Sequence, residues 1–209
     1  MKIGLDSYSF HIALAAGGYD IFRTLDWMAD LGFSGLQINI NGPDGRFLGR
    51  EPGDALHVKR VRAALETKGF FSEIGGRRTS PEMLQWQLQL CADLGADVLR
   101  TLLVLKDDLA STVASTRQDL ESVLPLAETL GVKIALENHE DVTAAELRQL
   151  LDRVPHPNLG ACIDTGNDLV VYGDPLEAAR QLASRALTTH VKDQRLVRVG
   201  DTIHSVGVA

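Results

Sequence analysis

Short apolar runs alternate along the chain with longer segments in which apolar residues recur every three or four positions. Runs of roughly four to eight apolar residues are typical of buried strands, and the longer period is typical of amphipathic helices. Strands are predicted at residues 3–8, 35–40, 70–74, 97–104, 132–137, 159–164 and 187–192. Helices are predicted at residues 19–32, 54–69, 80–95, about 112–130, 143–154 and 174–186. Helix-boundary residues support this assignment, because Ser80 and Pro81 suit a helix start and Gly95 suits its end.

The predicted strands end near residues 7, 39, 73, 101, 137, 164 and 190, so one strand–helix unit recurs every 26 to 36 residues. Such a period indicates right-handed crossovers and a parallel sheet, as in a (β/α)₈ barrel or a doubly wound open sheet. A doubly wound nucleotide binder usually carries a glycine-rich phosphate turn after an early strand. Residues 7–18, which follow the first strand, contain no such motif. We therefore favour the barrel, formed by a single domain over residues 1–209.

The predicted barrel is incomplete at its carboxyl end. A (β/α)₈ domain typically has about 250 residues, whereas this chain of 209 residues stops after the seventh predicted strand. The expected fold is therefore an α/β TIM barrel truncated after strand 7. A natural partial barrel, closed by a partner chain, is the alternative.

Composition and charge narrow the classes of partner. The chain has 21 basic and 28 acidic residues, a net charge of −7, which argues against a nucleic-acid surface. No apolar run approaches the ~20 residues of a membrane span, and the first residues do not resemble a secretory signal. Cys91 and Cys162 lie far apart in apolar surroundings, as reduced core thiols do. We expect a cytoplasmic protein with a small-molecule ligand and without a nucleic-acid or membrane partner.

Three metal-binding residue types end the last three predicted strands. Glu137, Asp164 and His190 are separated by 27 and 26 residues, one strand–helix unit each. Neighbouring parallel strands lie ~4.8 Å apart, so these side chains can converge on one ion. Two carboxylates and one imidazole favour Mn²⁺ or Mg²⁺, and they also accept Co²⁺ or Zn²⁺. Each residue alone has an ordinary alternative as a helix cap, a loop residue or a core histidine. His11 and Arg100 are weaker candidates for the same site.

Four segments together resemble a known family. They are MKIGLDSYSFH (1–11), ALENHE (135–140), CIDTGN (162–167) and THVKD (189–193), and in this order they resemble the sugar phosphate isomerase/epimerase family of xylose-isomerase-like TIM barrels. The resemblance implies a divalent metal, with Mn²⁺ as the first expectation, held by a Glu, an Asp, a His and a second Glu. The first three match Glu137, Asp164 and His190. The second Glu belongs on an eighth strand, which these 209 residues do not contain.

The resemblance also implies a reaction. An isomerase or epimerase of a small sugar or keto-sugar would use the metal to stabilise an enediolate, with Glu137 as the base. Contacts to substrate are expected from His11, Arg100, His139, Asn167, Lys192 and Arg195. Barrels of this type often pair, so a homo-oligomer stays among the expected partners.

Three alternatives are open. The first is a metal-dependent decarboxylase or dehydratase of a 3-oxo sugar acid or inosose, in which Lys192 or Arg100 would hold a carboxylate. The second is a non-catalytic binding module. The third, a nuclease, fits poorly, because the extra histidines of that branch are replaced here, for example by Asn167.

Overall fold

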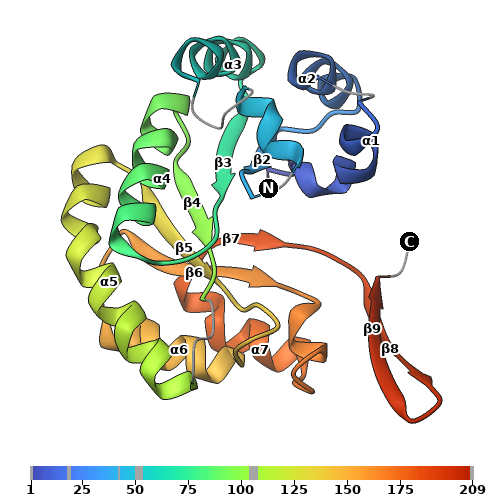
Figure 1. Cartoon of the computed structure of the whole chain (residues 1–209), viewed down its shortest axis with the longest axis vertical. Coiled ribbons are helices and arrows are strands. Elements are labelled where there is room, and N and C mark those ends of the chain that lie inside the picture. The colour runs from blue at the N-terminus through green and yellow to red at the C-terminus, as the bar shows by residue number, and fades with distance from the viewer. Residues whose placement is uncertain (1, 18–19, 42, 50–53, 104–107, 208–209) are drawn as a thin grey trace.

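Seven parallel strands form one sheet in sequence order, and the sheet curls so that its helices lie on the outside (Figure 1). The computed structural model describes residues 2–17, 20–41, 43–49, 54–103 and 108–207. The strands are β1 (Leu5–Asp6), β2 (Gly35–Asn39), β3 (Phe71–Gly75), β4 (Val98–Thr101), β5 (Lys133–Glu137), β6 (Leu159–Asp164) and β7 (Ala186–His190). This arrangement confirms a TIM-barrel fold in which the described residues provide seven of the strands.

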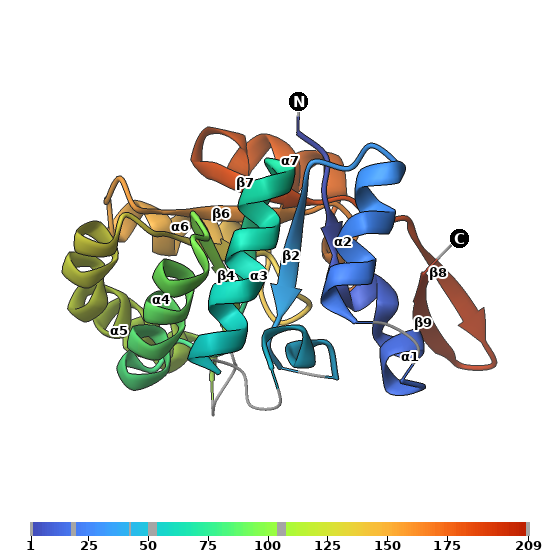
Figure 2. The same ribbon diagram turned by 90° about the horizontal axis from the view of Figure 1, so that it is seen from above.

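The helices between the strands lie on the outer face of the sheet, as the view from above also shows (Figure 2). Their apolar side chains pack there in one hydrophobic core. They are α1 (His11–Ala15), α2 (Ile21–Asp30), α3 (Ala55–Lys68), α4 (Pro81–Leu94), α5 (Leu109–Leu130), α6 (Ala144–Arg153) and α7 (Pro175–Leu182). Short 3₁₀ segments lie at Ser7–Phe10, Pro43–Leu48, Asn167–Leu169 and Ala183–Arg185. Most of the buried apolar residues belong to this outer core. No helix among the described residues is both long enough and apolar enough to cross a membrane.

The predicted elements agree with the structure except at several boundaries. The first strand is only two residues long, because the segment from Ser7 forms a 3₁₀ turn and then α1. The fourth strand ends at Thr101 and the seventh at His190, earlier than predicted. Residue 104 and Tyr19, at the ends of a predicted strand and a predicted helix, lie outside the described residues. Cys91 and Cys162 are free and buried, as predicted.

A carboxyl-terminal hairpin was not predicted. Strands β8 (Gln194–Val199) and β9 (Thr202–Gly207) pair antiparallel to each other and form a separate two-stranded sheet. Figure 1 shows the hairpin projecting away from the curled sheet. Two strand-like runs separated by the two residues Gly200 and Asp201 are the sequence pattern of a β-hairpin, and this pattern is present here.

Gly160 allows the backbones of β6 and β7 to lie close together. A Cβ atom at Gly160 would overlap the carbonyl oxygen of Arg185 and lie 2.7 Å from Leu187 Cγ. The pairing of these strands has a register shift immediately after this point, between Ala161 and Cys162. The backbone of β7 therefore needs a residue without a side chain at Gly160.

Replacing Gly160 with alanine is expected to destabilise the protein by about 1–3 kcal/mol, because overpacking must push β7 outward. Urea denaturation of the variant and of the wild type measures this difference. Gly207→Ala is the matched control, since a Cβ atom at Gly207 would meet nothing within 4 Å. Equal stability of Gly160→Ala and wild type would show that β7 adjusts freely.

Candidate metal-binding site

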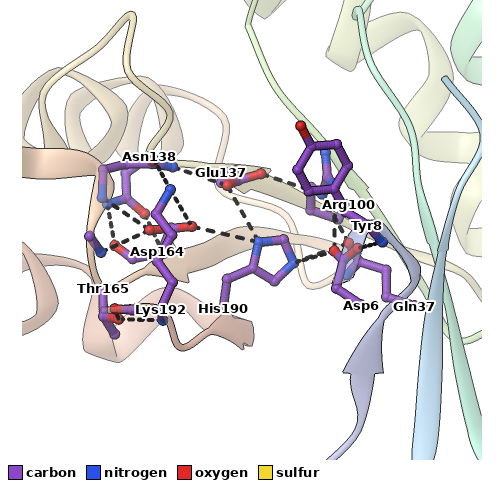
Figure 3. A network of polar contacts seen from close by, with 12 residues as sticks. Asp6, Tyr8, Gln37, Arg100, Glu137, Asn138, Asp164, Thr165, His190 and Lys192 are labelled. Atoms are coloured by element: carbon purple, nitrogen blue, oxygen red, sulfur yellow. Dashed lines mark hydrogen bonds and ion pairs between the residues drawn. The ribbon is translucent and has the colours of Figure 1, made fainter. Parts of the chain in front are cut away.

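The three predicted metal-binding residues come together at the carboxyl end of the sheet. Glu137, Asp164 and His190 are the last residues of β5, β6 and β7. His190 Nδ1 lies 3.4 Å from Glu137 Oε1 and 3.8 Å from Asp164 Oδ2 (Figure 3). The two carboxylates are buried, and the imidazole is partly buried. His190 therefore lies close to both carboxylates, and the assignment of the three residues as metal ligands stays a prediction.

Asp164 is held by both its backbone and its side chain. The Asn138 amide donates to the Asp164 carbonyl oxygen at 3.0 Å and accepts from the Asp164 backbone N–H at 2.7 Å. Asp164 Oδ1 accepts from the backbone N–H groups of Gly166 and Asn167 at 2.8 and 3.0 Å. These bonds occupy one carboxylate oxygen and leave Oδ2 directed toward His190 and Lys192.

A second buried carboxylate supports this arrangement. Asp168 Oδ2 accepts from Asn138 Nδ2 at 2.6 Å, so the amide that holds Asp164 is itself held. Burial raises the pKa of Asp168, although the hydrogen bond from Asn138 opposes the shift. The pair Asn138 and Asp168 therefore defines where Asp164 lies.

The Glu137 side chain is ionised, and both of its carboxylate oxygens have partners. Asn167 Nδ2 donates to Oε1 at 3.1 Å, and Arg100 Nε lies 3.3 Å from Oε2. Burial alone would raise the pKa of Glu137, but the hydrogen bond with His190 and the charges of Arg100 and His190 outweigh it and lower the pKa to about 2. The carboxylate is therefore negatively charged throughout the neutral range.

His190 is positively charged in this arrangement. Burial lowers its pKa, whereas the contacts with Cys162 and with the Glu137 carboxylate raise it, and the net shift is upward. We attribute that shift mainly to Glu137, because burial raises the pKa of the Cys162 thiol and a neutral thiol does not favour an imidazolium. The imidazolium and the Arg100 guanidinium thus both lie next to the Glu137 carboxylate.

The two separations measured around His190 suit ligands of one divalent ion. Ligands at 2.0–2.2 Å from one ion lie roughly 3–4 Å apart, and the separations of 3.4 and 3.8 Å around His190 Nδ1 agree with this. Among the described residues, the group whose ligand atoms all lie within 4.8 Å of one another is Glu137, Cys162 and His190, and Asp164 is not part of it. Cys162 lies two residues before Asp164 on β6, deeper in the sheet interior with Val98 and Ala135. The residues therefore provide oxygen and nitrogen ligands at the strand ends, with a thiol beneath them.

Uptake of Mn²⁺ is expected to become tighter as the pH rises, because the ion must displace a proton from His190 Nδ1. The raised pKa keeps that proton bound through the neutral range. Displacing one proton per ion makes the affinity rise on the order of tenfold per pH unit between about pH 6 and about pH 8. Calorimetric titration with Mn²⁺ in buffers of different protonation enthalpy measures both affinity and proton release. A pH-independent affinity without proton release would contradict this assignment.

The structure brings three of the predicted substrate-binding residues into the polar network. Asn167 contacts Glu137, and Lys192 Nζ lies 2.5 Å from Asn167 Oδ1 and 3.5 Å from Asp164 Oδ2. Arg100 is buried and engaged by protein groups through Nε, Nη1 and Nη2. Lys192 therefore presents the more accessible cation, since 39% of its side chain is exposed.

The other three predicted substrate-binding residues have different surroundings. The ring of His11 stacks on Tyr8 with centroids 4.4 Å apart. His139 Nδ1 lies 3.5 Å from Asp141 Oδ2. Arg195 is exposed on β8 of the hairpin, opposite Val206. In the described part of the chain, no hydrogen bond or ion pair joins these three side chains to Glu137, Asp164 or His190.

Sequence reasoning did not select the polar residues that face the candidate ligands from β1 to β3. Asp6, Gln37, Asn39 and Glu73 form a connected group there: Gln37 Nε2 donates to Glu73 Oε2 at 2.8 Å, and Asn39 Nδ2 donates to Asp6 Oδ1. His190 Nε2 lies 3.0 Å from Gln37 Oε1 and 3.6 Å from Asp6 Oδ2. Their positions near the carboxyl ends of strands were the available signal. Gln37 and Asp6 reach His190 on β7 only because the sheet curls. Their position at strand ends does not reveal that curl.

A curled parallel sheet with helices on its outer face and polar residues at the carboxyl ends of its strands defines the TIM-barrel class of proteins. The family model for the xylose isomerase-like TIM barrel matches residues 25–204. The chain belongs to the xylose isomerase-like TIM barrel family.

Curated relatives are similar over most of the chain. It is 25% identical over 206 residues to 3-oxo-isoapionate decarboxylase from Pectobacterium atrosepticum, covering 95% of this chain and 70% of that protein. It is 28% identical over 200 residues to the C-glycoside deglycosidase alpha subunit from Arthrobacter globiformis, covering 85% of this chain and 51% of that protein. The chain therefore spans about half of the second relative.

Solved structures show the same fold at low sequence identity. L-ribulose 3-epimerase superposes with a TM-score of 0.75 at 19% identity, covering 92% of this chain and 70% of that one. The IOLI protein, solved with a zinc atom, superposes with a TM-score of 0.75 at 16% identity, covering 97% of this chain and 76% of that one. Sugar epimerases, a dehydratase and a decarboxylase thus occur among the proteins similar to this chain.

Proposed function

We propose that the chain carries a divalent-metal-dependent isomerase or epimerase activity on a small sugar or keto-sugar, with proton transfer through an enediolate. The main observation that supports this proposal is that Glu137 Oε1 and Asp164 Oδ2 lie within 4 Å of His190 Nδ1. These residues would hold Mn²⁺ as the first expectation, with Mg²⁺, Co²⁺ or Zn²⁺ as alternatives. When bound, such an ion acts as a Lewis acid that acidifies the C–H group next to a substrate carbonyl. The zinc of the similar IOLI protein supports a divalent ion.

Each residue of the network has a role in this proposal. Glu137 is ionised and accepts the proton from the substrate carbon. Asn138 fixes Asp164 through its backbone, so the ligand geometry persists without substrate. Asn167 and Lys192 lie at the same strand ends and would contact substrate hydroxyl oxygens.

Isotope exchange tests the proposed reaction. The protein is incubated with Mn²⁺ and a panel of ketoses in deuterium oxide, and the products are followed by NMR. Deuterium is expected at the carbon next to the carbonyl, together with the epimer or isomer. Absence of exchange across the panel, by protein that has bound Mn²⁺, would contradict the proposal.

A second candidate function is decarboxylation or dehydration of a 3-oxo sugar acid or an inosose. The position of Lys192 favours it, because this half-exposed cation lies beside Asp164 and suits a substrate carboxylate. The similarity to 3-oxo-isoapionate decarboxylase supports the same class of substrate. Such a reaction needs one stabilised enolate and no second base.

Release of CO₂ from a 3-oxo sugar acid separates the two candidates. Lys192→Met is expected to raise KM for the acid by about tenfold or more, because a charge-assisted hydrogen bond is lost. KM for a neutral ketose should change little. An equal effect on both substrates would show that Lys192 does not recognise a carboxylate.

A further inference from the structure

Gln37 joins the two sides of the polar network, although it is neither a candidate ligand nor a predicted substrate-binding residue. It lies on β2 and is 5% exposed. Its Oε1 atom lies 3.0 Å from His190 Nε2 on β7 and accepts from Arg100 Nε on β4 at 3.1 Å. Its Nε2 atom donates to Glu73 Oε2 on β3 at 2.8 Å. One amide thus contacts side chains from three other strands. Figure 3 shows Gln37 between Arg100 and His190.

These neighbours determine which way the amide points. Glu73 is a carboxylate and only accepts, so it requires the NH₂ group of Gln37. Arg100 only donates, so it requires the oxygen. The opposite orientation would place two acceptors together at Glu73 and two donors together at Arg100. The oxygen of Gln37 therefore faces His190.

An oxygen at this position also requires a hydrogen on the nearer ring nitrogen of His190. Gln37 Oε1 cannot donate, so the contact of 3.0 Å requires a hydrogen on His190 Nε2. The second ring nitrogen, Nδ1, then faces Glu137 Oε1 and Asp164 Oδ2. Metal-binding histidines usually donate their other ring N–H to a fixed acceptor, which sets the tautomer and the ring orientation.

We propose that Gln37 is a positioning residue, held by Glu73 and Arg100, that keeps hydrogen on His190 Nε2 and presents His190 Nδ1 to a divalent ion. This inference rests on the proposed function, because it assigns His190 as a ligand. It adds that strands β2, β3 and β4, which supply none of the proposed ligands, determine how a ligand on β7 is presented.

Gln37→Leu removes the acceptor with little change in volume. The Kd for Mn²⁺, measured from the EPR signal of the free ion, is expected to rise by about 10- to 100-fold. Gln87→Leu is the matched control, because Gln87 is also buried but donates to the Arg77 carbonyl oxygen and has no hydrogen bond with His190 among the described residues. Its Kd for Mn²⁺ is expected to equal that of the wild type. A Kd for Gln37→Leu within about threefold of the wild-type value would overturn the proposal.

A paired exchange separates positioning from general disruption. In the double variant Gln37→Glu and Glu73→Gln, the carboxylate accepts from Arg100 and His190, and the new amide donates to it. The Kd for Mn²⁺ is expected to return to within about threefold of the wild-type value, whereas Gln37→Glu alone places two carboxylates together and loses affinity. Equal loss of affinity in the double variant and in Gln37→Leu would count against positioning.

NMR of the ¹⁵N-labelled, metal-free protein tests the hydrogen bond without the ion. A slowly exchanging His190 Nε2–H resonance, assigned by its loss in His190→Gln, is expected in the wild type and absent in Gln37→Leu. If this resonance is present but the wild type binds neither Mn²⁺ nor Zn²⁺, the proposed function fails and the hydrogen bond stands. If the wild type binds Mn²⁺ but the resonance is absent, the positioning role fails alone.

Discussion

Glu137→Gln is expected to lower kcat by about 10²–10⁴-fold, because the amide cannot accept a proton from the substrate carbon. The substitution keeps the side-chain volume and an oxygen that can accept from Asn167 Nδ2. It removes the negative charge that faces His190 Nδ1, so the affinity for Mn²⁺ should fall as well. Turnover is therefore measured at saturating Mn²⁺, on a substrate that the wild type exchanges with deuterium.

Glu140→Gln is the matched control for this prediction. Glu140 is exposed, lies three residues beyond Glu137 and is not part of the polar network. Its kcat is expected to equal that of the wild type. A Glu137→Gln variant that is folded, saturated with Mn²⁺ and retains kcat within about tenfold of the wild type would remove Glu137 as the base.

Arg100→Met is expected to destabilise the protein by about 3–5 kcal/mol, the usual cost of removing one partner of a buried ion pair. Arg100 is 7% exposed, and its loss leaves the Glu137 carboxylate without its guanidinium partner. It also removes the donors to Gln37 Oε1 and Asn39 Oδ1. Urea denaturation at neutral pH measures the loss in free energy of unfolding.

Two comparisons sharpen the Arg100 prediction. Arg117→Met breaks an exposed ion pair with Glu121, which is expected to cost no more than about 1 kcal/mol. The double variant Arg100→Met and Glu137→Gln removes both charges, so its destabilisation should be smaller than the sum of the two single effects. Strict additivity would show that the two charges do not stabilise each other.

The low pKa of Glu137 gives this pair a defined pH dependence. Its folded pKa of about 2 lies below the ordinary value of 4.5, so the carboxylate contributes stability that is fully present above about pH 4.5. That contribution is lost as the pH falls from about 4.5 toward 2.

The fold and the positions of the candidate ligands at strand ends could be predicted because both follow from local patterns. Glu137, Asp164 and His190 each end a strand, and equivalent positions in successive strand–helix units meet at one edge of a parallel sheet. The hairpin at 194–207 had a local signal as well, in two alternating runs around Gly200. It escaped prediction because the segment follows the last regular unit.

The remaining polar residues could not be predicted, because their partners are set by long-range geometry. Gln37 and His190 are 153 residues apart and come into contact only through the curl of the sheet. The spacing of strands places a residue at an edge but does not determine how far that edge bends. The contacts of Arg100 with protein groups have the same origin, since its partners lie on β1, on β2, at Gly76 just after β3, and on β5.

The candidate ligands and the residues that orient them lie in different parts of the chain. This separation affects how members of the family can diverge. The three candidate ligands lie in one contiguous stretch, residues 137–190, whereas Asp6, Gln37, Glu73 and Arg100 belong to earlier strands. Substitutions accumulating in the amino-terminal part can therefore retune ion preference without touching a ligand. Recombination between related genes near α5 would transfer the ligand stretch intact and pair it with a new set of orienting residues.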